Sequence, residues 1–138
     1  MSDPAYYVQK ALHQLLTGSS GLTDLVPASA IKDQFGGVPQ VFPSIVLGEA
    51  QIVDEGQAIA RNVHRVYSTW HIWTKEPSLN DVKKIGGAFR AAVAGQRPAL
   101  AGGYHLADLR IEDTRYVRDP SGENGHGVVT INALVSET

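Results

Sequence analysis

The chain has 138 residues, of which 43% are hydrophobic and 19% are charged, and its formal net charge at neutral pH is −2. These values are typical of a soluble globular protein and exclude a disordered, collagen-like or coiled-coil chain. The absence of cysteine excludes a disulfide framework, a zinc site built on thiolates and a cysteine nucleophile. No apolar run approaches the roughly 20 residues that a membrane span needs.

The N-terminal sequence shows no targeting signal and instead predicts a helix. Met1–Pro4 lacks the basic and then apolar regions of a secretory signal, so we expect the protein to be made and to fold in the cytosol. Asp3 can cap a helix that has Pro4 in its first turn. Apolar residues at helical spacing extend this helix over Pro4–Thr17, and Gly18 ends it.

The following segment predicts two strands with loops around them. Leu22–Leu25 can add one further helical turn, and Ala30–Asp33 is typical of a short strand. The glycines and the proline of Gln34–Gln40 indicate a loop. Ser44–Val53 predicts a second strand, and the polar stretch Asp54–Asn62 predicts a long hairpin loop.

Val63–Thr74 has the highest β-propensity of the chain because it is rich in Val, Tyr, Thr, Trp and Ile. Bulky side chains alternate onto both faces of this strand, so we expect a helix on one face and another covering on the other. Its aromatic residues and Tyr104 are expected in the core or under a second copy of the protein, and a stacking platform for a ligand is the alternative.

A second helix is predicted to follow a cap at Ser78, with Asp81 in a capping-box position. Its apolar stripe runs to Val93, and Gly95 stops it. The pair Gly86–Gly87 costs roughly 1 kcal/mol per glycine inside a helix. Close packing of the helix backbone on a sheet would offset this cost.

The last third of the chain predicts a hairpin of two long strands. Tyr104–Arg118 and Gly127–Val135 alternate in polarity, and the residues between them, Asp119–Gly125, are dense in turn formers. In the first of these strands, one face is expected to hold Ala107, Leu109, Ile111 and Val117. The order α-β-β-β-α-β-β predicts the α+β class, with two helices packed on one face of a mainly antiparallel sheet, in a single domain over residues 1–138.

Motifs for catalysis, nucleotides or metals are absent from the sequence. His64 and His71 have odd separation on one strand, so they point to opposite faces and cannot share an ion. Glu112 and Asp113 are adjacent on a strand and likewise diverge, which spoils a carboxylate pair. Arg110 with Glu112, and Asp113 with Arg115, are instead the charge pairs of a sheet surface or a subunit seam. We therefore expect no catalytic residue, cofactor or metal.

Several segments resemble one family in the same order along the chain. Two of them are the Phe42–Glu49 segment, FPSIVLGE, and the strand end HIWT at His71–Thr74. The others are the Asp3–Pro4 helix start, Lys84–Ala92, Arg115–Pro120, Gly122 and His126–Gly127. The chain resembles, over essentially its whole length, the tail-completion or tail-terminator proteins of long-tailed bacteriophages and gene transfer agents.

This resemblance implies a structural virion protein without enzymatic activity. Tail terminators form a ring, typically a hexamer, that caps the head-proximal end of the tail tube and stops its growth. The implied partners are further copies of the chain, the tail tube protein and a head-completion or connector protein, with DNA passing through the lumen without specific binding and no membrane involved. The implied location is the cytoplasm of the bacterial host during assembly and then the particle tail.

Two alternatives remain at this stage, a head–tail connector ring and a small cytosolic enzyme or ligand-binding domain that uses the His- and Trp-rich strand. For the ring, a heterologous interface is needed, in which two different patches of each subunit meet. We expect the Asp54–Asn62 and Asp119–His126 loops to contact neighbouring subunits or the tube. The candidate interface residues are Asp54, Glu55, Arg61, Arg65, Arg110, Glu112, Arg118, Asp119 and His126.

Overall fold

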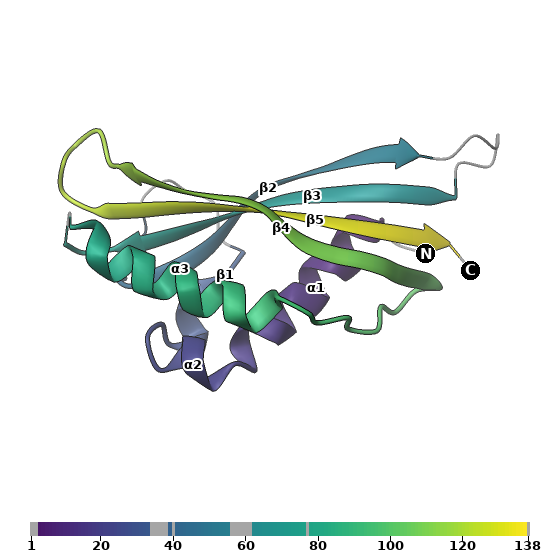
Figure 1. The fold of residues 1–138 in the computed structure, drawn as a ribbon, viewed down its shortest axis with the longest axis horizontal. Coiled ribbons are helices and arrows are strands. Elements are labelled where there is room, and N and C mark those ends of the chain that lie inside the picture. The colour runs from purple at the N-terminus through teal and green to yellow at the C-terminus, as the bar shows by residue number, and fades with distance from the viewer. Residues whose placement is uncertain (1–2, 34–38, 40, 56–61, 77, 138) are drawn as a thin grey trace.

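The computed structural model describes residues 3–33, 39, 41–55, 62–76 and 78–137. In it, two long helices lie against one face of a five-stranded sheet (Figure 1). The helices are α1 (Pro4–Thr17), the short α2 (Ser20–Thr23) and α3 (Leu79–Val93), with a 3-10 turn at Ala28–Ala30. The strands are β1 (Ile31–Lys32), β2 (Ser44–Glu55), β3 (Val63–Thr74), β4 (Tyr104–Arg118) and β5 (Gly125–Glu137).

The strands lie in the order β1-β2-β3-β5-β4, and only the short β1 pairs in parallel with its neighbour β2. The other pairs are antiparallel. This arrangement confirms the predicted α+β class and the order of the main elements. The bounds of α1, β3 and β4 are those that the sequence predicts.

The ends of two strands differ from the prediction. Asp54 and Glu55 belong to β2 and pair with β3, whereas the sequence places them in a hairpin loop. Likewise Gly125 and His126 begin β5. Gly125 pairs with Thr74 and His126 pairs with Trp73. In each case the backbone ladder continues through residues whose side chains are polar or absent, because pairing is made by the backbone and needs no apolar side chain. The rest of the Asp54–Asn62 prediction falls largely outside the described residues.

Both predicted helix caps are confirmed. The Asp3 carboxylate accepts a hydrogen bond from the backbone N–H of Ala5 at 2.8 Å, and the Ser78 hydroxyl accepts one from the N–H of Asn80 at 3.2 Å. These bonds satisfy backbone donors that the first turn of a helix leaves without an intrahelical partner. None of the described helices is long and apolar enough to cross a membrane.

The core lies between the two long helices and the sheet. Trp70 of β3 and Phe89 of α3 are almost completely buried and meet edge to face, with ring centroids 6.2 Å apart. The predicted core position of Trp70 is therefore correct. Apolar side chains from every strand belong to the same buried cluster, among them Ile31, Ile45, Val66, Ile72, Leu106, Val129, Ile131 and Val135.

Irregular pairing in β4 changes one predicted face. The register of β4 against β5 shifts between Leu106 and Asp108 and again between Ile111 and Asp113. The second shift reverses the alternation, so Val117 pairs with His126 on the face away from the helices, and Tyr116 takes the core side. The prediction that Val117 shares a face with Leu109 is therefore wrong, because a bulge adds one residue to one strand only.

The two glycines of α3 have different surroundings. A Cβ on Gly86 would overlap the Tyr116 hydroxyl and would lie 2.9 Å from its Cζ, whereas a Cβ on Gly87 would meet nothing within 4 Å. Close packing of the helix on the sheet thus explains the first glycine, as the sequence suggests, but not the second.

We expect Gly86→Ala to lower the free energy of unfolding by about 1–3 kcal/mol, because the Tyr116 ring must move out of a packed position. Gly87→Ala, the matched control, should raise it by about 0.5–1 kcal/mol through helix propensity alone. Urea denaturation of the two variants measures both changes. Equal effects at the two positions would contradict the packing role of Gly86.

Candidate functional site

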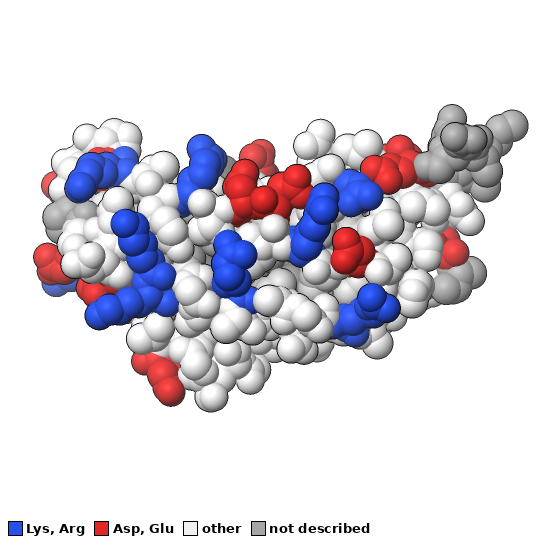
Figure 2. Space-filling model, in the orientation of Figure 1, with Lys and Arg blue, Asp and Glu red and all other residues white. Residues whose placement is uncertain are grey.

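The face of the sheet that points away from the helices carries several of the charged residues that the sequence singled out, among them Glu55, Arg65 and Arg110. On β3 this open face receives the odd-numbered side chains, from Arg65 to Trp73, while the even-numbered ones enter the core. No described helix covers it (Figure 1). On the right of Figure 2, where the strands face the viewer, basic and acidic groups lie next to each other. The covering that the sequence predicts for this face is therefore not supplied by the described part of the chain itself.

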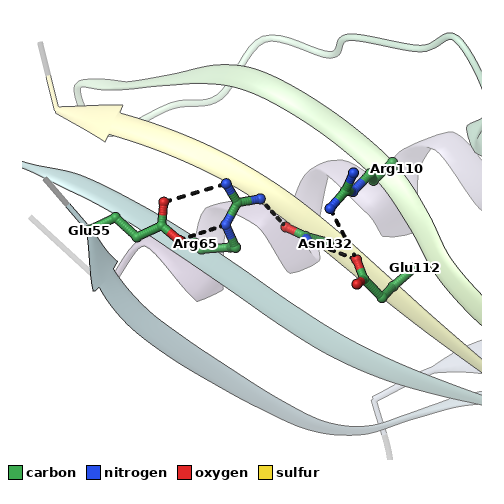
Figure 3. Close-up of polar contacts among 5 residues, drawn as sticks. All are labelled: Glu55, Arg65, Arg110, Glu112 and Asn132. Atoms are coloured by element: carbon green, nitrogen blue, oxygen red, sulfur yellow. Dashed lines mark hydrogen bonds and ion pairs between the residues drawn. The ribbon is translucent and has the colours of Figure 1, made fainter.

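A chain of polar contacts crosses the open face from β2 to β4 (Figure 3). The Arg65 Nε donates to Glu55 Oε1 at 2.8 Å, and its Nη1 donates to Asn132 Oδ1 at 2.9 Å. Asn132 Nδ2 in turn donates to Glu112 Oε2 at 2.9 Å, and Arg110 Nη2 lies 3.5 Å from the same oxygen. Four of the nine predicted interface residues thus belong to one network, joined by a residue that the sequence analysis missed.

Asn132 is the centre of this network. It is only 2% exposed although it lies on the open face, because its neighbours cover it. Its amide is suited to the position, since it can accept from a guanidinium on one side and donate to a carboxylate on the other. A hydrogen bond to Arg65 lowers the pKa of Glu55, and the same bond raises the pKa of Arg65. Both groups are therefore charged at neutral pH.

Asp54 belongs to a different group at the same end of the sheet. The His64 imidazole lies between two carboxylates, with Nδ1 2.7 Å from Asp54 Oδ1 and Nε2 3.4 Å from Glu137 Oε2. Burial disfavours the charged form of His64, but the hydrogen bonds to Asp54 and Glu137 outweigh it and raise its pKa. This group ties β2, β3 and β5 together near their ends.

The remaining predicted residues lie at the opposite end or outside the described residues. Asp119 begins the β4–β5 turn, where it accepts hydrogen bonds from Ser121 and Asn124, and the bond from the Ser121 hydroxyl lowers the pKa of Asp119. Arg118 is the exposed last residue of β4. Arg61 lies outside the described residues. The structure therefore divides the predicted set between two ends of the sheet.

A cluster of rings on the open face was not predicted. His71 Nδ1 and His126 Nε2 lie 2.8 Å apart, and the His126 ring stacks on Trp73 with centroids 3.9 Å apart. Burial lowers the pKa of His126 to about 4, helped by the nearby charges of His71 and Arg115, and burial also lowers the pKa of His71. Gly48 makes room for the cluster, since a Cβ there would lie 2.6 Å from His71 Nε2. The residue separation along the chain gives no signal for this contact.

The described residues offer no constellation for catalysis or metal binding. No group of three His, Asp or Glu side chains among them could hold a metal ion. A hollow of about 410 Å³ on the open face is lined by Glu49, Gln51, Tyr67, Thr69 and Thr130. His71 and His105, which an enzyme would bring together, lie at opposite ends of the sheet, since they pair with Val128 and Ser136 of β5.

Comparisons with known proteins identify the class of protein and the family. The model of the family "Tail completion protein gp17" matches residues 10–136. The chain belongs to this family, and it is a structural tail protein rather than an enzyme. Its fold is similar to that of a chain in the structure titled "Virion of native gene transfer agent (GTA) particle", with a TM-score of 0.84 at 19% identity over 99% of both chains. A comparison with curated proteins gives no match.

The central amide of the network can be tested by an isosteric change. Asn132→Leu removes the hydrogen bonds to Arg65 and Glu112 while keeping nearly the same volume, so we expect the free energy of unfolding to fall by about 1–2 kcal/mol. Thr130→Val, on the same face of β5, is the control and should change it by less than about 0.5 kcal/mol. Urea denaturation measures both, and an unchanged Asn132→Leu midpoint would show that the network adds no stability.

The low pKa of His126 predicts acid sensitivity. In the unfolded chain a histidine has an ordinary pKa of about 6.5, so between pH 6.5 and about 4 the unfolded state binds more protons and stability falls as the pH falls. His126→Phe keeps a ring on Trp73 but removes this titration. Its melting temperature should therefore fall less than that of the wild type between about pH 7.5 and 5.

His64 provides a control, because its contribution to stability changes with pH in the opposite direction to that of His126. Because its pKa is raised, its contribution to stability is present below about pH 6.5 and is lost as the pH rises through the folded-state pKa. His64→Gln should therefore cost more stability in mild acid than in mild alkali. If acidification lowers the melting temperatures of His126→Phe and of the wild type by the same amount, His126 is not the group responsible for the acid sensitivity.

Proposed function

We propose that this protein forms a ring that caps the head-proximal end of a tail tube, ends polymerisation of the tube and joins the tail to the head. The observation that carries the proposal is the family match across residues 10–136. The similarity of the fold to a gene transfer agent virion chain over 99% of both chains supports it. In this proposal the protein assembles in the host cytoplasm and then remains in the particle tail.

The size and surface of the chain are compatible with a ring. A compact chain of 138 residues has a radius of gyration of about 14 Å, so one copy cannot surround a lumen through which DNA passes. The net charge of −2 favours passage of DNA over tight binding, because phosphate contacts need a surplus of basic residues. The proposed partners are further copies of the chain, the tube protein and a head-completion protein.

Light scattering after size exclusion, over a range of protein concentrations, gives the first test. We expect a discrete closed oligomer of about six copies, either in the free protein or after recruitment to purified tail tubes. Electron microscopy of tubes growing with and without the protein gives the second. Tubes should stop at a uniform length, each with the protein at one end only.

Tubes that continue to grow, or protein that binds along their sides, would contradict the capping role. A ring that binds the portal side and ignores the tube would instead indicate the head–tail connector.

A further inference from the structure

Both edges of the sheet are long and lack a strand partner among the described residues. β1 pairs only with Ile45 and Val46 of β2, and no other described strand pairs with the outer edge of β2 from Leu47 to Glu55. β4 forms the other edge from His105 to Arg118. Unpaired backbone groups on an exposed edge favour pairing with another strand. We propose that β2 of one copy pairs with β4 of the next copy, staggered so that Glu49 faces an arginine. This inference rests on the proposed ring.

The directions of the two edges fit such a contact. Each neighbouring pair from β2 through β3 and β5 to β4 is antiparallel, so β2 and β4 of one chain run in opposite directions. When a second copy in the same orientation is placed beside the first, its β2 therefore lies antiparallel to β4. Such a contact joins two different patches, which is the heterologous type that closes into a ring.

The charges at the two edges disfavour pairing of β2 with β4 of the next copy without an offset along the strands. Glu49 pairs with Thr69, Thr69 with Thr130, and Thr130 with Asp113, so these four residues form one row across the open face. If β2 of one copy paired with β4 of the next without any offset along the strands, Glu49 of one copy would lie beside Asp113 of the other. Both carboxylates are exposed, and like charges directly opposite each other destabilise strand pairing.

A stagger of one row replaces this repulsion at Glu49 by attraction, and the slide toward Arg110 does so without setting Glu55 opposite Asp108. The adjacent rows of the open face end on β4 at Arg110, which pairs with Asn132, and at Arg115, which pairs with Val128. Sliding the neighbour by one row in either direction therefore brings an arginine opposite Glu49. A slide by one row also keeps both open faces on the same side, because side chains alternate with a period of two. Stagger is the geometry that closure of a sheet requires.

Cysteine cross-linking tests the register, because the chain has no cysteine of its own. Three double variants combine Glu49→Cys with Arg115→Cys, Arg110→Cys or Asp113→Cys. Within one chain β3 and β5 separate these positions by roughly 14 Å, beyond the roughly 7 Å that a disulfide spans between Cα atoms. Any disulfide is therefore intermolecular. Glu49→Cys alone is one control, and Glu49→Cys with Asp24→Cys is the other, since Asp24 is an exposed residue directly after α2 on the helix side.

We expect oxidation of the assembled protein to give a ladder of covalent multimers with one of the two arginine positions, at least tenfold more than with Asp113→Cys or with the controls. A charge exchange gives an independent readout. Glu49→Arg should raise the concentration needed for ring assembly at least tenfold, and Arg115→Glu or Arg110→Glu in the same chain should restore it.

The outcomes separate this inference from the proposed function. A wild-type ring without cross-links at these positions, or with the Asp113→Cys pair dominant, would overturn the staggered edge contact and leave the ring intact. A Glu49→Arg variant that still forms rings but no longer binds tubes would assign the β2 edge to the tube protein and overturn it too. If the wild type forms no ring, either free or on tubes, the proposed function is wrong, and the edge contact that depends on it is wrong too.

Discussion

The unbroken pairing of β3 with β5 is the constraint on which the rest of the structure depends. All twelve residues from Val63 to Thr74 pair with β5 without a register shift, whereas the pairings of β2 and β4 contain the irregularities. Because side chains alternate strictly along this central pair, it fixes which residues enter the core and which reach the open face. The outer strands then adjust to this frame, and their bulges re-aim individual side chains without disturbing the core.

The two faces of the central strands are stabilised by different physical interactions. Burial of apolar side chains such as Trp70, Ile72 and Ile131 against the helices stabilises one face. The other face is ordered by hydrogen bonds to charged groups, from Glu55 through Arg65 and Asn132 to Glu112, and by the stacked rings near His126. A surface ordered in this way stays defined while exposed to water, which suits a subunit whose task is to present surfaces to others.

Much of the fold follows from local sequence, and much of the site does not. The caps at Asp3 and Ser78 and the periodicity of the helices are local signals, so the helices could be predicted closely. The Arg110–Glu112 contact is local too. Asn132, however, meets Arg65 from 67 residues away, and His126 meets His71 from 55. Such contacts depend on strand register, and bulges such as the one before Asp113 leave no pattern in a single sequence.

The row that ends in Glu49 and Asp113 has a consequence beyond function. Identical copies with two open edges are at risk of stacking flat into a fibril, because every new edge is a template for the next chain. Such growth needs copies that pair without an offset, and that arrangement places the Glu49 carboxylate opposite the Asp113 carboxylate at every contact between copies. We therefore expect these two side chains to disfavour the unstaggered stacking of free copies through their sheet edges.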